Sequence, residues 1–499
     1  MRDFKIENGV LLKYRGKDTD IVIPEGVTTI VEEAFSRRES LQSVNVPHSV
    51  TSIGKRAFCY CKSLRSISIP DSVTSIGESA FFYCRSLQSI NVPDSVKSIG
   101  NNAFSWCKSL QSINIPDSVK SIGESAFYGC ESLQSISIPS SVTSIGGNAF
   151  SWCKSLQSIN IPDSVTTVEW GAFYGCKSLR SIDIPEGVTS IEWGAFSRCE
   201  SLQSITIPDS VTTICNSAFL YCKNLQNITI PDSVTSIGAG AFSDCVNLRS
   251  INIPDSVKSI GNRIFSGCES LRSINIPYGV TSIGEHAFYG CKSLRSINIP
   301  DSVTSMGNGV FSGCGSLQSV NVPDSVTSIG NRAFSGCESL KSINIPDGVK
   351  SISAIFGDSL PKIYIPYIPV WYPRMTDTAI KKYVLSKEIW NALDEETKKD
   401  IFIKKQSESL MKTFLTLITP DLTEKIAAYY LAQLTSPLTA AECKKTVSFI
   451  INFYSRLSDD TVRSLYEALT LQENGKTPAE ELKKDPVIAG KLTASGEAD

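Results

Sequence analysis

The sequence contains very few of the residues on which acid–base and metal chemistry depend. Its 499 residues include only two histidines, His48 and His286, and neither lies in the last 200 residues. Because histidine is the usual acid–base group near neutral pH and a frequent zinc ligand, this scarcity argues against hydrolase and zinc-site functions. No glycine-rich phosphate loop or nucleophile–base pair is evident. We therefore expect neither an enzyme nor a bound cofactor or metal.

An excess of charge of either sign is also missing, as are long hydrophobic runs. The 48 basic residues nearly balance the 50 acidic ones, whereas nucleic-acid-binding proteins usually carry a basic excess. No apolar run approaches the roughly 20 residues that a membrane span needs. The first twenty residues contain no apolar segment of signal-peptide length. We expect no nucleic-acid partner, no membrane insertion and a cytoplasmic location.

What the sequence does contain is a single internal repeat. A proline recurs every 23 residues from Pro24 to Pro346, at fifteen positions and without insertion or deletion. One unit reads SLRSISIPDSVTSIGESAFFYCR, from Ser63 to Arg85. The following interval, to Pro366, is only 20 residues long, as expected of a terminal unit. This periodicity predicts a solenoid in which neighbouring coils bury one another's apolar sides.

The apolar positions within the unit are fixed, and we number them from its proline. Ile or Val stands at −3 and −1, Val at +3, Ile at +6, Ala-Phe at +10 and +11, Cys at +14 and Leu at +17. Neither a helical nor a strand period accounts for this spacing. Ile-x-Ile predicts a short strand, and Val-x-x-Ile a second one. Pro-Asp-Ser predicts a type I turn with proline at the first central position. Ala-Phe predicts one tight helical or 3₁₀ turn.

This pattern resembles the leucine-rich repeats of the BspA-like family. The resemblance is carried by Leu64 to Pro70, Val73 to Gly77 and Ala80 to Cys84, and it extends over about residues 5 to 366. It implies a mainly β leucine-rich repeat solenoid with short 3₁₀ or helical turns. It also implies ligand recognition, since family members are often displayed on cell surfaces as adhesins.

We expect three regions, and the last of them differs from the repeats. They are an N-terminal cap over residues 1–22, a solenoid of about 15 units over 23–370, and a small all-α domain over 371–499. Within the last region helical spacing begins at Asp394, and Thr419-Pro420 is a helix start. Thr439 to Glu442 is a capping box, Ser458 is an N-cap, and a last short helix starts at Thr477. This domain either caps the open end of the solenoid or is a second docking module.

Most cysteines belong to the repeat. Thirteen of the sixteen recur every 23 residues from Cys61 to Cys337, whereas Cys59, Cys215 and Cys443 lie outside this register. Stacked side chains point in parallel, so we predict a reduced ladder of buried thiols instead of disulfides. So many free thiols favour a reducing compartment.

Aromatic residues gather at the variable positions of the unit, +7 to +9 and +12 to +13. Most lie between residues 82 and 221, and the candidate partner-binding residues are Phe82, Tyr83, Trp106, Tyr128, Trp152, Trp170, Tyr174, Trp193 and Tyr221. Aromatic residues are enriched at the energetically dominant positions of protein interfaces. The alternative is that these rings cover the coil edge and shield the Phe at +11.

The polar strand positions offer a second candidate surface. Position −2 is mostly Asn, and position −4 is Ser in nearly every unit. This face is either solvated and held by side-chain amide ladders or a binding surface.

These observations predict a non-catalytic protein–protein interaction scaffold whose protein partner is unknown. The alternative, which follows from the family resemblance, is a cell-surface or secreted adhesin or ligand-recognition protein. An enzyme with its site in the helical domain is the third interpretation.

Overall fold

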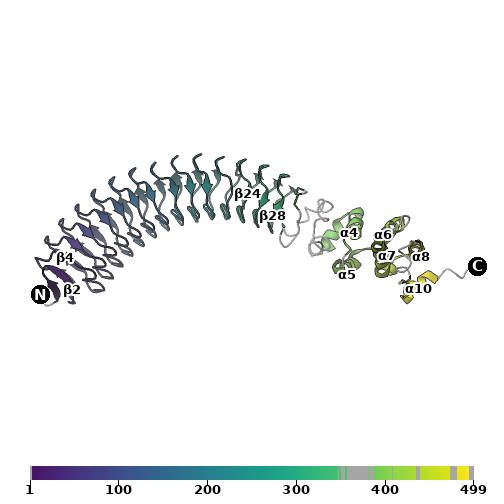
Figure 1. Ribbon diagram of the computed structural model, residues 1–499, viewed down its shortest axis with the longest axis horizontal. Helices are drawn as coiled ribbons and strands as arrows, with labels where there is room; N and C mark the ends of the chain where they lie inside the picture. Colours follow the sequence, from purple (N-terminus) through teal and green to yellow (C-terminus); the bar gives the residue numbers. More distant parts are fainter. Residues whose placement is uncertain are drawn as a thin grey trace, which may run out of the picture. The chain divides into compact units, whose positions relative to one another are not determined.

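The computed structural model describes residues 3–346, 348–349, 355–356, 380, 387–406, 408–433, 439–471, 480 and 482–493. The chain forms two compact units, the first comprising Met1–Val349 with Ile355–Gly357 and the second Lys350–Ala354 with Asp358–Asp499. Figure 1 shows the first unit as a curved stack of coils and the second as a group of helices. The boundary predicted at residue 370 and the start of the helix predicted at Thr477 lie outside the described residues.

The solenoid of about 15 turns is held by two sets of short parallel strands, as the repeat predicts. The first set precedes each proline and pairs in register, so that Ile67 lies beside Val44 of the preceding coil. Its strands alternate exposed, buried, exposed, because only the central residue points into the core. They are β3 (Asp20–Val22), β5 (Ser43–Asn45), β7 (Ser66–Ser68), β9 (Ser89–Asn91), β11 (Ser112–Asn114), β13 (Ser135–Ser137), β15 (Ser158–Asn160), β17 (Ser181–Asp183), β19 (Ser204–Thr206), β21 (Asn227–Thr229), β23 (Ser250–Asn252), β25 (Ser296–Asn298), β27 (Ser319–Asn321) and β29 (Ser342–Asn344).

The strands of the second set lie at +5 and +6 of each coil. This set starts from an N-terminal hairpin. Strands β1 (Phe4–Glu7) and β2 (Val10–Tyr14) are antiparallel, and β2 then pairs in parallel with the first coil. The later strands are β4 (Thr29–Ile30), β6 (Ser52–Ile53), β8 (Ser75–Ile76), β10 (Ser98–Ile99), β12 (Ser121–Ile122), β14 (Ser144–Ile145), β16 (Thr167–Val168), β18 (Ser190–Ile191), β20 (Thr213–Ile214), β22 (Ser236–Ile237), β24 (Ser282–Ile283), β26 (Ser305–Met306) and β28 (Ser328–Ile329).

The proline turn differs by one residue from the prediction. The amide of Val73 donates to the carbonyl of Pro70 over 3.0 Å, so proline is the first residue of the turn, and Asp71 and Ser72 are the central ones. Proline has no N–H for the strand ladder and therefore ends the strand. Because the turn starts one residue later than predicted, Ser72 occupies a central position. Its hydroxyl donates to the carbonyl of Val50 in the preceding coil over 2.6 Å.

The Ala-Phe segment is not the helical or 3₁₀ turn that its sequence suggested. It is a run of three overlapping turns, in which the amides of Ala57, Cys59 and Cys61 each donate to a carbonyl three residues earlier. The alternate amides donate to the next coil instead, and that of Phe58 reaches the carbonyl of Ala80 over 2.8 Å. A helix would turn every amide back onto its own segment. We call residues +8 to +13 of each coil the turn run.

Phenylalanine at +11 forms the central stack of the core. The rings from Phe35 to Phe334 are nearly parallel, with centroids 4.8 to 5.8 Å apart in successive coils. The N-terminal hairpin continues the stack, since the ring of Tyr14 lies 5.4 Å from that of Phe35. Glycine at +7 lets most coils approach closely. A Cβ on Gly77 would lie 2.6 Å from the backbone nitrogen of Lys55.

The cysteines at +14 are free and buried, as expected, and each also donates a hydrogen bond. Every thiol in the ladder donates to the phenylalanine carbonyl of the preceding coil, over 3.1 to 3.2 Å. Burial raises the pKa of most of these thiols, to about 12 at Cys61. The protonated thiol is thus both a small apolar filler and a tie between coils.

The second unit is helical, and its caps follow the sequence. The helices are α3 (Lys387–Ala392), α4 (Glu395–Lys404), α5 (Glu408–Leu417), α6 (Pro420–Gln433), α7 (Ala440–Phe453), the 3₁₀ turn η4 (Tyr454–Arg456), α8 (Asp459–Thr470) and α10 (Pro486–Thr493). The predicted capping box forms, because Thr439 and Glu442 each accept the other's amide hydrogen bond through the side chain. Ser458 caps α8. Phe402 packs edge-on against Phe414, Phe449 and Phe453 in the core of this unit.

Candidate interaction surface

The turn runs of successive coils, together with the residue at +7, form one continuous edge of the solenoid, which we call the turn edge. Backbone hydrogen bonds tie each run to the next. A groove of about 430 Å³ at the N-terminal end joins both variable segments, since Arg56 at +9 and Tyr60 at +13 both line it. The residues at +7 to +9 and at +12 to +13 therefore belong to a single surface.

All nine predicted aromatic residues lie on this edge, at two depths. Those at +12 and +13 are half-buried, namely Phe82, Tyr83, Trp106, Tyr128, Trp152, Tyr174 and Tyr221. Trp170 and Trp193 stand at +8 and are 41% and 53% exposed. The edge therefore presents rings that are partly packed and partly open to solvent.

Ring contacts divide the half-buried residues into separate groups. Tyr60, Phe82, Tyr83 and Trp106 form a chain of neighbours with centroids 5.0 to 6.2 Å apart. Trp106 also meets Tyr128 edge-on at 5.4 Å. The other groups are smaller. Trp152 meets Tyr174 edge-on at 5.5 Å, and Tyr221 faces the guanidinium of Arg198 at 4.8 Å.

The aromatic residues at +13 have an uncommon backbone conformation. Tyr60, Tyr83, Trp106, Trp152 and Tyr221 have φ between 60° and 66°, in the left-handed region, where several other coils carry glycine. A side chain costs about 1 kcal/mol or more there, because its Cβ crowds the following carbonyl oxygen. Five coils thus hold a bulky ring at a position where glycine would be less strained.

Glycine in the next coil makes room for the tryptophans. A Cβ on Gly129 would lie 3.0 Å from the indole of Trp106, and one on Gly175 would lie equally close to Trp152. Each indole therefore spreads over the backbone of its neighbouring coil. The segment FSWCKS begins at Phe104 and again at Phe150, and in each case FYGC follows in the next coil. The same arrangement therefore occurs twice on the edge, two coils apart.

Charged residues complete each tryptophan group. The ammonium groups of Lys108 and Lys154 lie 5.2 and 5.8 Å from the ring centres of Trp106 and Trp152, within range of a cation–π attraction. Both lysines also pair with Glu131, over 2.8 and 3.2 Å. Hydrogen bonding from Lys108 is the main reason that the pKa of Glu131 is lowered. The two tryptophan groups are thus joined through one carboxylate.

A departure from the repeat that the sequence analysis did not use marks two adjacent coils. Glu169-Trp170-Gly171 and Glu192-Trp193-Gly194 occupy +7 to +9, where most coils have glycine at +7 and a polar or charged residue at +8. The parallel ladder of the second strand set breaks there, since β16 and β18 belong to different sheets. A depression of about 170 Å³ lies beside the break and is lined by Thr166, Thr167, Val168, Glu169, Trp170, Thr189, Ser190 and Glu192. The replacement of glycine at +7 was the sequence feature that could have pointed to this depression.

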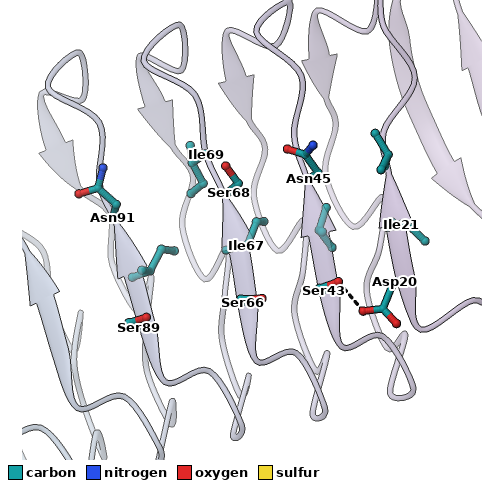
Figure 2. Close-up of a pocket in the computed structure, with 13 residues that line it drawn as sticks. Asp20, Ile21, Ser43, Asn45, Ser66, Ile67, Ser68, Ile69, Ser89 and Asn91 are labelled. Carbon is teal, nitrogen blue, oxygen red and sulfur yellow. Dashed lines mark hydrogen bonds between the residues drawn. The ribbon is translucent and has the colours of Figure 1, made fainter.

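The strand face is hollowed but uniform. A shallow groove of about 610 Å³ lies over the first coils. Figure 2 shows the serine and asparagine side chains that line it in parallel rows. Ser43 and Thr19 donate hydrogen bonds to Asp20, and that of Ser43 is the main reason that the pKa of this carboxyl is lowered. One of the two interpretations of this face was a ladder of side-chain amides. Among the described residues no asparagine at −2 bonds another, so that ladder does not form there. Similar side chains recur from coil to coil, and the face therefore lacks distinct anchors.

In the part of the chain that the structure describes, no three side chains of the histidine, cysteine, aspartate and glutamate types gather to hold a metal ion. Likewise, none of the described helices combines the length and the apolar composition that crossing a bilayer requires.

Comparisons with solved structures show bacterial relatives of the solenoid. A leucine-rich repeat protein from Bacteroides ovatus is 33% identical, with a TM-score of 0.65, and the alignment covers 71% of this chain and 95% of that one. A leucine rich cell surface protein from Faecalibacterium prausnitzii is 35% identical over 62% of this chain and 89% of its own, with a TM-score of 0.44. A search of curated proteins found no match.

The repeat region itself matches one family model. The model describes a BspA type leucine rich repeat region of six copies, and its overlapping matches cover residues 12–134, 74–192, 144–272 and 235–359. The chain therefore belongs to the BspA-type leucine-rich repeat family.

Proposed function

We propose that this protein is a non-catalytic scaffold that binds a protein partner along the turn edge between Phe82 and Tyr221. The observation that carries the proposal is the row of aromatic residues in left-handed backbone conformation. Leucine-rich repeat proteins usually act in interactions or at surfaces, which agrees with this role.

The energetic argument compares the aromatic coils with the glycine coils of the same chain. At Gly267, Gly290 and Gly313 the turn run forms with glycine at +13, so the fold does not need a ring at that position. Each ring at +13 instead adds strain and leaves half-exposed aromatic surface. Burying such aromatic surface against a partner releases free energy, because apolar surface is removed from water. Trp and Tyr are also enriched at the energetically dominant positions of interfaces.

An affinity pull-down from lysate of the native host tests the proposal. Full-length protein is compared with a variant carrying Trp106→Ser and Trp152→Ser, after circular dichroism and urea unfolding show that both fold. Tyr278→Ser is the matched control, because Tyr278 is 77% exposed but lies in a proline turn, away from the turn edge. We expect a partner that the full-length protein and the control retain and the double variant loses. Equal retention by all three proteins contradicts the proposed face.

We also propose that the protein works in the cytoplasm. The support is its set of thirteen stacked thiols, all free and acting as hydrogen-bond donors in the protonated state. Free thiols persist in reducing compartments. Cell fractionation with an antibody against the helical unit tests this, and recovery at the cell surface would favour the adhesin alternative.

A further inference from the structure

We infer that the two Glu-Trp-Gly coils form a binding site for an arginine or lysine side chain in an extended segment of the protein partner. The inference rests on the proposed function and specifies the partner chemistry at one part of the turn edge. It is argued from the exposure of two indoles, the charge around them and the way the coils depart from the repeat.

The two indoles are the first part of the argument. Trp170 and Trp193 come from adjacent coils at the same position, and both are exposed in a chain whose other large apolar residues are mostly buried. Trp170 lies against the backbone of Gly147, where a Cβ would come within 2.7 Å of its ring. One indole face is thus seated on the solenoid, and 41% of the residue remains open.

The two coils depart from the repeat in the same place where the indoles are exposed. Glutamate replaces the glycine found at +7 in most coils, and β16 and β18 belong to different sheets. Trp193 remains 53% exposed and is not packed away by its neighbours. An apolar surface that stays exposed in this way is typical of a binding site.

The charge of the depression selects the occupant. Its only charged side chains are Glu169 and Glu192. Glu169 accepts one hydrogen bond, from the amide of Gly147 over 2.8 Å, and Glu192 accepts from Ser190 over 2.6 Å and from the thiol of Cys215 over 3.8 Å. Because a carboxylate offers about four acceptor positions, both can still accept from a ligand.

In the described part of the chain, no basic residue lines this depression. Position +4 carries lysine in other coils, at Lys97, Lys120 and Lys258, but Thr166 and Thr189 occupy it here. Arg198, in the same coil as Trp193, is directed to the ring of Tyr221 at 4.8 Å. An indole face beside carboxylates attracts a cation both through the ring quadrupole and through charge-assisted hydrogen bonds. A symmetric contact with a second copy of this chain would instead place like carboxylates opposite one another.

Isothermal titration calorimetry of the full-length protein tests the inference with three synthetic peptides. The first is a nine-residue peptide of alternating glycine and arginine. In the second, citrulline replaces arginine, which keeps the shape and removes the charge. In the third, glutamate replaces arginine. Two variants of residues that line the depression, Trp170→Ser and Glu169→Gln, are compared with two matched controls. The controls are Tyr278→Ser and Glu124→Gln, both at exposed positions outside the depression.

We expect the arginine peptide to bind at low salt. We expect each site variant to weaken this binding at least tenfold, and both controls to leave it unchanged. Replacing arginine by citrulline should weaken binding at least tenfold as well. Absence of binding, equal binding of the citrulline or glutamate peptide, or equal effects of site and control variants would each overturn the inference. A dimer in sedimentation that Trp170→Ser dissociates would also overturn it, because the occupant would then be a second copy.

The outcome separates this inference from the proposed function. If the peptides fail but a partner is captured in a manner sensitive to Trp106 and Trp152, only the cationic site is refuted. If both experiments fail, the turn edge is not the binding surface.

Discussion

Truncating one ring of the phenylalanine stack should destabilise the solenoid far more than removing an exposed indole from the same region. Phe173 is fully buried and lies between Phe150 and Phe196, with both ring centroids 5.5 Å away and interplanar angles of 6° and 2°. Phe173→Ala therefore removes contacts with two neighbouring coils as well as the burial of the ring. We expect a loss of about 3–5 kcal/mol in the free energy of unfolding, the range for large core truncations.

Trp193→Ser is the comparison, because Trp193 lies in the next coil and is 53% exposed. Surface substitutions of this kind usually change stability by about 0.5 kcal/mol or less. The assay is urea unfolding, followed by circular dichroism. Because each coil of a solenoid is stabilised by its neighbours, Phe173→Ala should also uncouple the coils on its two sides and broaden the transition. Equal large losses in both variants would refute the assignment of Trp193 to a binding surface, and an unchanged midpoint in Phe173→Ala would refute the role of the stack.

Further predictions concern the coil contacts, the thiols and the helix caps. Gly77→Ala should lower stability by about 1–3 kcal/mol in urea unfolding, because its Cβ would meet backbone 2.6 Å away, whereas Gly315→Ala, with nothing within 4 Å, should be neutral. Burial raises the pKa of the Cys176 thiol, so its contribution to stability is complete below the ordinary thiol pKa of about 9 and should be lost as the pH rises above that value, at up to about 1.4 kcal/mol per pH unit. Urea midpoints measured between pH 7 and 11 should therefore fall less steeply for Cys176→Ala than for the unchanged protein. Thr439→Ala should cost the helical unit about 0.5–2 kcal/mol through loss of its cap, measured by thermal unfolding of the full chain.

The helical unit shows which local features a sequence reveals directly. The capping box at Thr439 and the N-cap at Ser458 were predicted from residues three apart, and their hydrogen bonds connect those same residues. Because these interactions are local, composition and spacing suffice to locate them. Their energies do not depend on where the rest of the chain lies.

The turn edge shows what the sequence left open. The sequence located aromatic residues at variable positions but did not distinguish binding from shielding of the core. The structure places Trp106 over Gly129 and leaves Trp193 exposed, which gives the two indoles different surroundings. That difference depends on the neighbouring coil, whose residues are 23 positions away.

The sequence by itself determined the solenoid, its register and the identity of its core, because the same side chains return every 23 residues and every coil meets a near copy of itself. The tertiary structure decided how the segments between the core positions are bent. Proline became the first residue of its turn, the Ala-Phe segment became part of a run of turns whose alternate amides donate to the next coil, and the cysteines became donors to the preceding coil. These outcomes share one physical reason. Each depends on hydrogen bonds between residues 22 to 26 positions apart, and the geometry that satisfies them exists only once two coils are stacked.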